Sequence, residues 1–595
     1  MFPLLYKYMS DKLESEKQHF QLPIYYIVDK TEIESHICDD LNLYCQDNSA
    51  DNIKLEETKN TESHSVYENA FLPTSNFSKQ TIPLWSKYFT KNKRFLIDTQ
   101  ELLKQNIENT TYDYTQIEDI WNKINTETSF HEKYQYIDLP LFKWVNKNSA
   151  ILQILSMYNI SSPVIALALP IFFLIIPFFL IRLKGIELSF SKYKEVLYHI
   201  ISKHHLGQIF TIGSVSWDKR VYIIMTCGLY ILQTYQNIIS CIQFYKHSKI
   251  IHTQVYHVKL YLQHTIEKMT QLERCCEKLQ SYKPFIDNMN KHKLLLAKYL
   301  QYISVIPPFS VSLQKFIDLG RPMKAFYELY NDSGLQISLQ YSFGLNGYMH
   351  NLHGLQTNIK NKHISLCSFS KDKTIFKKAY YPPKRKNTIC NTYNLNKHLL
   401  LTGPNASGKT TLLKTTITNI ILSQQCGCGF YKKAVIAPYN NIYCYINIPD
   451  TSGRDSLFQA EARRCKDILD KIKESPKTDR HFCVFDELYS GTNPYEATSG
   501  AISFLQYLNK NPNITFFITT HYLELCKRLD KIKSIKNYHM KTKVSYENNK
   551  ENFTYVYKLQ KNISNIQGGV KVLTDLGYPE EIVNGTKKIM KSLHI

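Results

Sequence analysis

The stretch HLLLTGPNASGKTT, from His398 to Thr411, decides how the C-terminal part of the chain folds. Three leucines lead into a segment that satisfies the phosphate-loop pattern GxxxxGK[ST]. Its glycines let backbone N–H groups converge on phosphates, and the helix that must begin near Gly408 points its positive end at the same anion. A chance match is disfavoured, because the pattern lies between an apolar strand and an amphipathic helix. We therefore expect a nucleotide site formed by Gly403, Pro404, Asn405, Ala406, Ser407, Gly408, Lys409, Thr410 and Thr411.

Two further strand ends carry side chains that suit the same chemistry. Lys409 supplies a point charge to the phosphates, and the Thr410 hydroxyl is placed to bind Mg²⁺. The segment HFCVFDE ends in Asp486, which reaches the shell of Mg²⁺, and Glu487, which polarises the attacking water. A third apolar run precedes His521, which can sense the γ-phosphate, although a lone histidine is usually a surface group. Together with the loop, these residues predict ATP hydrolysis that depends on Mg²⁺.

The chain is strongly basic, but its charge is uneven. The formal net charge of the 595 residues is +22. Residues 31–70 contain ten acidic residues and two lysines, a local charge of −8, so the remainder carries about +30. This excess favours a polyanionic partner such as a nucleic acid. The alternative is a lysine-rich coding bias, which the abundance of Lys, Asn and Tyr makes credible.

The cysteines and the first residues indicate the compartment. Fourteen cysteines are scattered without the spacing of a disulfide framework or a zinc site. The opening MFPLLYKYMSDK has too short an apolar run for a secretory signal. We expect reduced thiols and an intracellular protein.

The length allows about three or four domains. Residues 1–75 are expected to form an acidic leader with little regular structure, since periodic hydrophobicity is scarce there. Residues 76–250 are expected to be helical, and residues 251–375 to form a helical lever or clamp and its connector. The final region, 376–595, would be the nucleotide-binding domain.

One apolar segment leaves two interpretations open. Pro163–Ile181 contains 19 residues without a charge, followed by Arg182 and Lys184, and is just long enough to span a bilayer core of about 30 Å. The other interpretation is a buried core helix or hairpin broken at Pro170 and Pro177.

The lever region is predicted from a periodic pattern. Between Val255 and Leu279, apolar residues recur at steps of three and four, which is typical of a long helix with one apolar face. A second helix over 288–303 would return antiparallel to it, either as a coiled-coil arm or as part of an ordinary bundle. Residues 371–386 hold seven basic residues and one acidic residue, either a solvated loop or a contact for phosphates.

Four segments resemble the ATPase domain of the MutS family of DNA mismatch-recognition proteins. They are TGPNASGKTT (402–411), DSLFQAEARR (455–464), FDELYSGTNPYE (485–496) and TTHY (519–522). Only 77 residues separate Lys409 from Asp486, too few for the helical subdomain of a transporter ATPase. Asn537-Tyr-His539-Met540 is also similar to the family's closing strand, and the terminal GGVKVLTDLGYPEEIV to its dimerising helix-turn-helix.

The resemblance implies a fold and a set of roles. It implies a multidomain α/β protein whose residues 376–595 form a P-loop NTPase domain of the ABC-type, MutS-like kind, with a mostly parallel sheet and a mainly α-helical lever or clamp before it. Ser456 and Glu461 fall on the segment that reaches the nucleotide of the partner subunit, Gly491 on the D-loop, and His521 on the switch histidine. The implied ligands are ATP, Mg²⁺ and duplex, mismatched or branched DNA. The implied assembly is a homodimer or a dimer with a related subunit.

The resemblance fails toward the N-terminus. The candidate for the family's mismatch-reading Phe-x-Glu is Phe130-His131-Glu132, which lies deep in the chain. The outline is similar to divergent MutS-like ATPases of large DNA viruses, so the expected compartment is the cytoplasm, the nucleus or a viral replication site. Two rivals stay open: a membrane-attached ATPase anchored by 163–181, and a relative that acts on RNA or ribosomes.

Overall fold

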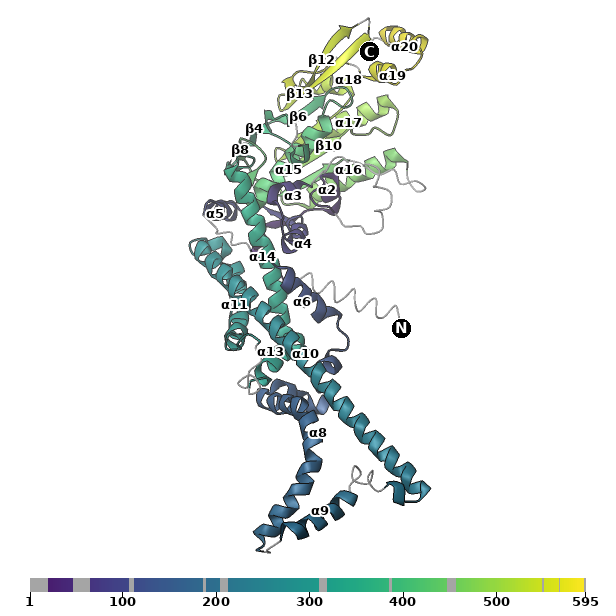
Figure 1. Ribbon diagram of the computed structural model, residues 1–595. Helices are drawn as coiled ribbons and strands as arrows, with labels where there is room; N and C mark the ends of the chain where they lie inside the picture. The colour runs from purple at the N-terminus through teal and green to yellow at the C-terminus, as the bar shows by residue number, and fades with distance from the viewer. Residues whose placement is uncertain are drawn as a thin grey trace. The chain divides into compact units, whose positions relative to one another are not determined.

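The computed structural model describes residues 20–45, 65–105, 112–185, 189–203, 212–309, 318–384, 388–446, 456–547, 550–564, 566 and 568–592 (Figure 1). The chain divides into two compact units, which are described separately. Unit 1 consists of Met1–Thr110, Thr270–Asn290 and Gln340–Ile595, and unit 2 of Thr111–Met269 and Lys291–Leu339. The multidomain organisation and the combination of long helices with sheets agree with the sequence-based expectation.

A six-stranded sheet organises the C-terminal part of unit 1 in the order β13-β12-β6-β11-β10-β9. Its strands are β6 (His398–Thr402), β9 (Asn441–Tyr445), β10 (His481–Asp486), β11 (Ile514–Thr519), β12 (Ile535–Glu547) and β13 (Lys550–Lys561). The strands from β12 to β9 pair in parallel, whereas β13 pairs antiparallel with β12 at the edge. Both β6 and β10 are almost wholly buried and apolar, as expected of parallel strands covered on both faces. The residues that follow β6, β10 and β11 therefore meet at one edge of the sheet.

Three helices cover this sheet through one apolar core. They are α16 (Leu457–Glu474), α17 (Pro494–Asn509) and α18 (Leu523–Leu529). Ile468, Leu505 and Leu525 of these helices are fully buried against strand residues such as Phe485 and Ile518. This packing fixes the strand ends that carry the predicted catalytic residues.

Helix α15 (Lys409–Cys426) follows the predicted phosphate loop directly. It contacts β10 and β11 and also β2, β7 and α5, so it is buried along nearly its whole length. Its buried amides are paired: the Gln424 side chain donates to the Tyr439 carbonyl at 2.8 Å and accepts from the Tyr439 N–H at 2.9 Å. The helix ends at Gly427, whose φ of 67° is the left-handed conformation that glycine adopts without strain.

A second sheet of five strands, in the order β5-β4-β8-β3-β7, belongs to the same unit. The strands are β3 (Ser365–Phe369), β4 (Ile375–Ala379), β5 (Asn391–Asn394), β7 (Cys428–Gly429) and β8 (Lys433–Ile436). The exposed lysines Lys371, Lys373, Lys377 and Lys378 of the predicted basic cluster lie in and just before β4. The cluster is therefore partly strand, where the sequence favoured a loop.

The part of unit 1 before residue 105 is ordered where the structure describes it. It contains η1 (Pro23–Tyr26), β1 (Lys30–Glu32), α2 (Ser35–Asp40), α3 (Val66–Phe71), α4 (Asn76–Trp85), β2 (Tyr88–Thr90) and α5 (Lys93–Lys104). Tyr67 and Phe71 are completely buried, and the Tyr67 hydroxyl contacts the Gln425 side chain of α15 at 3.1 Å. Within residues 20–45 and 65–75 this corrects the expected leader without regular structure. These short segments gain order by packing on distant parts of the chain, such as α15 for Tyr67 and Phe285 for Phe20.

Unit 2 consists of helices. They are α6 (Thr115–Thr126), α7 (Phe130–Lys133), η3 (Pro140–Lys147), α8 (Ser149–Leu183), α9 (Phe190–Lys203), most of α10 (Trp217–Cys276) and α13 (Gly320–Asn331). Helices α11 (Lys283–Ser304) and α14 (Ser333–Lys360) belong partly to each unit. The helix expected from 255 begins much earlier, at Trp217, because residues 217–254 continue its helical pattern without a breaking proline. Its expected apolar face is correct, since Val258, Leu262 and Met269 are fully buried.

The apolar segment Pro163–Ile181 lies within α8, which continues through Pro170 and Pro177. Residues Ser149–Ala168 of this helix have a mean hydropathy of 1.5, and only 11% of this window is buried. None of the residues of 163–181 whose exposure is described is buried. The interpretation as a buried core helix broken at its prolines is therefore wrong. Among the described residues, α8 is the one helix that is both long enough and apolar enough to cross a membrane.

The expected candidate for a mismatch-reading Phe-x-Glu, Phe130-His131-Glu132, is part of the core of unit 2. Phe130 is 5% exposed, and its ring stacks on Tyr330 with 3.9 Å between centroids and on Tyr136 with 5.1 Å. A phenylalanine buried in this way does not project toward a base pair.

Candidate nucleotide-binding site

The predicted phosphate loop joins β6 to α15 and has the backbone conformation that its glycines permit. Gly403 has φ 153° and Gly408 has φ 93°, and a Cβ on Gly408 would lie 3.0 Å from a ring carbon of Tyr557. Ala406 also has positive φ, at 59°. The loop therefore turns tightly and directs the N-terminal end of α15 toward the space above it.

Lys409 is held inside this loop. Its side chain is 5% exposed, and its ammonium donates to the carbonyls of Gly403 at 3.1 Å and Pro404 at 3.4 Å. The ammonium also lies 3.0 Å from Nε2 of His521 and 3.7 Å from Oε1 of Glu487. Burial lowers the pKa of Lys409, and the nearby carboxylates of Glu487 and Asp486 oppose this shift.

Asp486 brings two threonine hydroxyls together at the end of β10. Thr410 donates its hydroxyl hydrogen to Oδ2 of Asp486 at 2.7 Å, and the Thr519 hydroxyl donates to Oδ1. A hydroxyl and a carboxylate are hard oxygen ligands of the kind that Mg²⁺ takes in small number beside phosphates and waters. Thr410 and Asp486 therefore fit the predicted metal-binding pair.

Glu487 follows Asp486 with a φ of 53°, an unusual backbone conformation for a residue with a side chain. Its N–H donates to the carbonyl and the hydroxyl of Thr519, both at 3.2 Å. Its Oε1 lies 2.9 Å from Nε2 of His521, and this hydrogen bond, with help from Lys409, lowers the pKa of the Glu487 carboxyl against the effect of burial. The side chain is still 43% exposed, so water can reach it.

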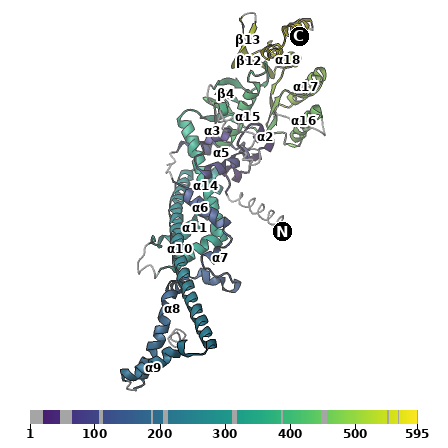
Figure 2. The same ribbon diagram turned by 45° about the vertical axis from the view of Figure 1, so that its right-hand side comes forward.

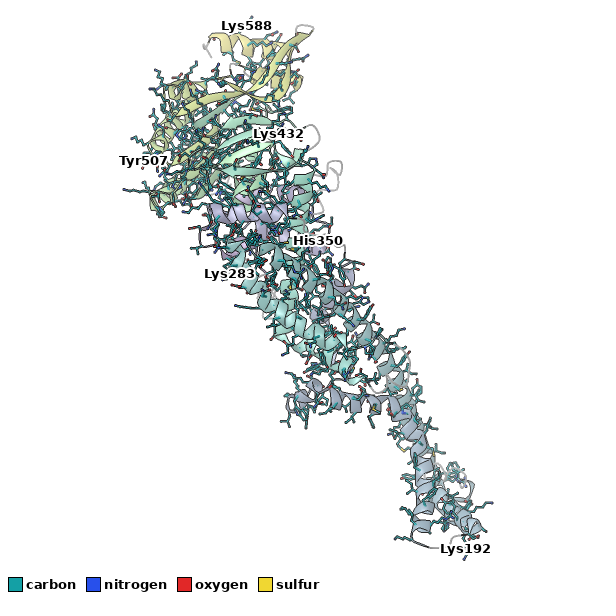
Figure 3. The ribbon with its side chains drawn as sticks, turned by 90° about the vertical axis from the view of Figure 1, so that its left-hand side faces the viewer. Lys192, Lys283, His350, Lys432, Tyr507 and Lys588 are labelled. Carbon is teal, nitrogen blue, oxygen red and sulfur yellow. The ribbon has the colours of Figure 1, made fainter. Side chains whose placement is uncertain are left out.

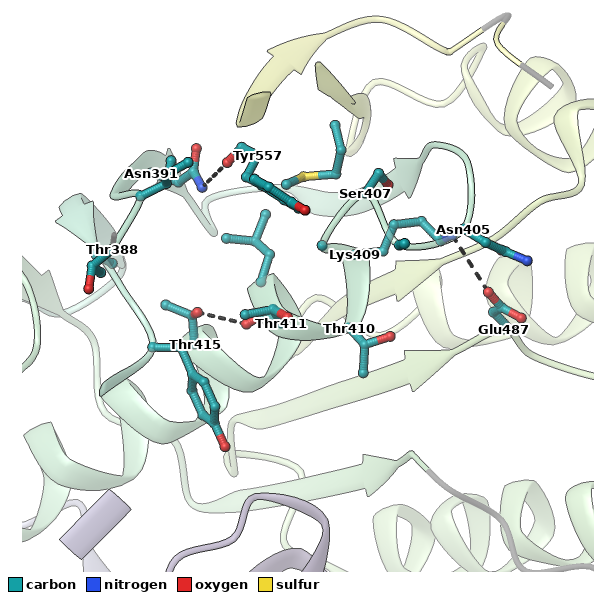
Figure 4. Close-up of a pocket in the computed structure, with 17 residues that line it drawn as sticks. Thr388, Asn391, Asn405, Ser407, Lys409, Thr410, Thr411, Thr415, Glu487 and Tyr557 are labelled. Carbon is teal, nitrogen blue, oxygen red and sulfur yellow. Dashed lines mark hydrogen bonds and ion pairs between the residues drawn. The ribbon is translucent and has the colours of Figure 1, made fainter. Parts of the chain in front are cut away.

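A cavity of about 660 Å³ opens above the loop (Figure 4). At one end it is lined by Asn405 to Leu412 together with Glu487, and at the other by aromatic and apolar side chains. Its volume is within the range of pockets that hold small molecules. The residues at the far end include Ala379, Tyr381, Thr388, Ile389 and Asn391, and Met540 and Tyr557 extend from there to the side of Gly408.

Sequence reasoning missed most of this far end. Tyr557 lies on β13, and the Asn391 side chain fixes that strand, because it donates to the Tyr557 carbonyl at 3.0 Å and accepts from the Leu559 N–H at 2.9 Å. The β12–β13 register shifts between Met540 and Thr542, which places both Met540 and Tyr557 at the cavity. The available signal was Met540, which lies in a segment expected to form the closing strand.

Ser456 lies apart from the residues that line the cavity. It caps α16: its hydroxyl accepts from the Gln459 N–H at 3.3 Å, and its N–H donates to the Gln459 side chain at 3.0 Å. It is exposed and does not line the cavity. The structure thus brings Lys409, Thr410, Asp486, Glu487 and His521 together within one chain, and leaves Ser456 outside.

Glu461 anchors the same helix to the segment after Glu487. It is 2% exposed and accepts from the N–H of Ser490 at 3.0 Å, the hydroxyl of Ser490 at 2.9 Å and the N–H of Gly491 at 3.2 Å. A Cβ on Gly491 would lie 2.9 Å from the backbone of Phe458, so glycine is required for this approach. The expected D-loop is therefore tied rigidly to the start of α16.

Comparison with known proteins matches the same part of the chain. Residues 399–594 match the family model described as MutS domain V. The DNA mismatch repair protein MutS of Orientia tsutsugamushi (strain Ikeda) is 30% identical over 207 residues, which are 34% of this chain and 22% of that protein. The proteins of the same name from Persephonella marina and Bacteroides fragilis are 28% and 31% identical, over 36% and 33% of this chain.

The chain matches less than a quarter of the length of these curated relatives: 22% of the Orientia and Bacteroides proteins and 24% of the Persephonella protein. The matched part contains the loop, both strand-end carboxylates and His521. The predicted family resemblance is confirmed over this part of the chain. The resemblance to viral chains stays a prediction.

Proposed function

We propose that this chain, whose residues 399–594 match MutS domain V, is a dimeric, Mg²⁺-dependent ATPase of MutS type that binds DNA and acts in mismatch repair or related repair and recombination. The observation that carries the proposal is the convergence of Lys409, Thr410, Asp486, Glu487 and His521 at the ends of three neighbouring strands. On this proposal, residues 376–595 form a P-loop NTPase domain.

ATP would occupy the cavity with its phosphates at the loop and its base at the far end. The loop N–H groups and the start of α15 favour the anionic phosphates. Tyr557, Met540 and Ile389 offer the aromatic and apolar surface that a planar base requires. Thr410 and Asp486 would hold Mg²⁺, which would neutralise charge on the phosphate oxygens.

Binding of ATP would rearrange the contacts of Lys409. Its ammonium now satisfies two loop carbonyls and lies near Glu487 and His521. A γ-phosphate is a stronger acceptor than these carbonyls, so Lys409 would turn to it and leave the Glu487 carboxylate free to orient water. His521, already bonded to Glu487, would hold that carboxylate in position.

The second subunit would complete the site. Ser456 lies at the exposed start of α16, where the N–H groups of the helix are available to an anion. We propose that this end contacts the triphosphate of a partner, either a second copy of this chain or a related subunit. The Glu461 bonds to Ser490 and Gly491 would keep the two contacting segments together.

DNA is proposed as the polyanionic ligand. The net charge of +22 supports a polyanion, and the curated relatives are named DNA mismatch repair proteins. Phe130 is buried and therefore does not insert beside a mismatched base. The binding experiment below tests whether the ligand is duplex, mismatched or branched DNA. We propose an intracellular site of action, in the cytoplasm, the nucleus or a viral replication site, where reduced thiols and DNA occur together.

A binding panel tests the proposal. Homoduplex, mismatched duplex, branched DNA and structured RNA are compared at several salt concentrations, with and without ATP and Mg²⁺. The proposal expects DNA to bind more tightly than RNA, with an affinity that falls steeply with salt and changes with ATP. Preferential binding of structured RNA would contradict the DNA proposal and favour the alternative that this protein acts on RNA or ribosomes.

A further inference from the structure

Unit 2 carries a long arm whose outer surface is apolar. In Figures 1 and 2, α8 and the first half of α10 form its two sides, and α9 closes its far end, where Figure 3 labels Lys192. Large apolar side chains are exposed along both sides, for example Val164 at 68%, Ile224 at 62% and Leu229 at 58%. Exposed apolar surface of this extent marks an interaction site.

The arm carries no charge over most of its length. No charged residue lies between Lys147 and Arg182 on the α8 side, a run of 34 residues, or between Arg220 and Lys246 on the α10 side, a run of 25. At 1.5 Å per residue these runs extend about 51 Å and 38 Å, and each exceeds a hydrocarbon core of about 30 Å. Each run is bounded at both ends by a basic residue, as expected where a helix leaves the hydrocarbon for lipid phosphates.

This charge pattern does not suit a nucleic acid. Protein surfaces that bind phosphate backbones present lysine and arginine along the contact, and the uncharged runs contain neither. The arm is not part of a folded core either. The α8 residues after Ser156 whose exposure is described are all at least partly exposed.

The backbone of α8 provides a second, independent observation. A proline at position i deprives the carbonyl of residue i−4 of its helical N–H donor. Pro170 does this to Ala166, whose carbonyl accepts instead from the Tyr230 hydroxyl of α10 at 3.0 Å.

Pro163 has the same effect on Asn159. The Asn159 carbonyl accepts from the Ser162 hydroxyl at 3.1 Å, so this group is also satisfied. Cys241 of α10 adds a contact to the Ile160 carbonyl at 3.4 Å. Water would satisfy these carbonyls on an exposed helix, whereas in hydrocarbon a neighbouring side chain must do so.

We propose that α8 and residues 221–245 of α10 form a helical hairpin that inserts into a lipid bilayer and anchors the protein there. Helix α8 is the main span, since residues 221–245 contain more Thr, Gln and Asn. The return segment supplies the Tyr230 hydroxyl and a second apolar surface. The hairpin acts independently of the nucleotide site and of the proposed DNA ligand.

Flotation with vesicles tests this anchor. The full chain is reconstituted from detergent without ATP or DNA, into vesicles of phosphatidylcholine alone and of phosphatidylcholine with phosphatidylglycerol. We expect it to float with both kinds of vesicle and to resist extraction by 1 M salt and by alkaline carbonate. Two exposed positions are replaced in the variant Val164→Asp/Ile224→Asp, which should lose flotation, because charged side chains in hydrocarbon are costly.

Leu294→Asp is the matched control, because Leu294 is 72% exposed on α11 of the same unit and lies outside the arm. It should float as the wild type does, and far-UV circular dichroism should show all three proteins folded. A wild-type chain that stays soluble and monomeric without detergent overturns the proposal, as does release by salt or carbonate. A chain that ignores vesicles but self-associates through the arm also overturns it, with a second copy as the partner.

Discussion

The carboxylate of Glu487 lies 2.9 Å from Nε2 of His521, at the exposed edge of the loop that holds Lys409. The hydrogen bond from His521 and the charge of Lys409 lower the pKa of the Glu487 carboxyl, so it is ionised at neutral pH. Glu487 is therefore available to orient and polarise water once Lys409 has turned to a phosphate.

Replacement of this carboxylate should separate binding from turnover. Glu487→Gln keeps the shape and the contact with His521 but removes the charge. We expect kcat for ATP hydrolysis to fall by at least about 100-fold, while the Kd for ATP changes by less than about threefold. Steady-state phosphate release and equilibrium binding of a fluorescent ATP analogue measure the two quantities. Unchanged turnover would remove the assigned role of Glu487.

Lys409 is expected to act on nucleotide affinity as well as on hydrolysis. Lys409→Met removes a charged hydrogen-bond donor of the phosphates, which is worth about 1.5–3 kcal/mol, or a loss of about 10- to 150-fold in affinity. Lys432→Ala removes an exposed lysine of the same unit and should change nothing. Equal ATP affinity in wild type and Lys409→Met would mean that the phosphates bind elsewhere.

Tyr557 is expected to recognise the base. Its ring lies beside Gly408 and lines the cavity. Tyr557→Ala should weaken ATP binding by about 1–2 kcal/mol through lost ring contact, whereas Tyr557→Phe should bind nearly as well as wild type. The same substitutions should have little effect on inorganic triphosphate, which lacks a base. If Tyr557→Ala weakened both ligands equally, the base would lie elsewhere.

His398 should make stability depend on pH. Burial lowers its pKa to about 4, its ring stacks on Phe516 at 3.9 Å, and its Nδ1 accepts from the Phe516 N–H at 3.2 Å. The folded state therefore favours neutral imidazole. As pH falls below about 6.5, the unfolded chain binds the proton first, and stability is lost progressively until about pH 4, by on the order of 3 kcal/mol.

Thermal unfolding across this pH range measures the effect. His398→Asn should flatten the loss of stability between pH 6.5 and pH 4, whereas His363→Asn, at an exposed position of the same unit, should leave it unchanged. A wild-type slope in the His398 variant would show that other groups cause the dependence.

The site could be predicted from sequence where it depends on local patterns. The loop, α15 and the carboxylates after β10 follow from glycine spacing and apolar runs that precede polar residues. Tyr557 and Asn391 could not be found in this way, since the hydrogen bond that brings them together joins residues more than 160 positions apart. Ser456 was identified by resemblance alone, and within one chain it remains a helix cap.

The fold was predictable to a similar degree. The buried face of α10 was read correctly from its periodicity, but its start was placed near 255, because most of the large apolar residues before that point are exposed and do not form one buried face. Apolarity also left open whether residues 163–181 span a membrane or are buried in the core, and in the structure those whose exposure is described are at least partly exposed. Composition does not reveal what surrounds an apolar helix. The leader was misjudged because its apolar residues gain their order by packing against distant parts of the chain, as Phe20 does on Phe285 and Tyr341 and Tyr67 does on α15.

The central claim is that two copies of this chain share each triphosphate, one through Lys409 and Glu487 and the other through Ser456. Mixing two inactive variants tests it most directly. Lys409→Met and Ser456→Arg should each abolish ATP hydrolysis alone, whereas a mixed dimer contains one site with an intact Lys409 and an intact Ser456. The account predicts that an equal mixture recovers about a quarter of the wild-type rate, because half of the dimers are mixed and each has one working site. A mixture as inactive as its components would contradict it.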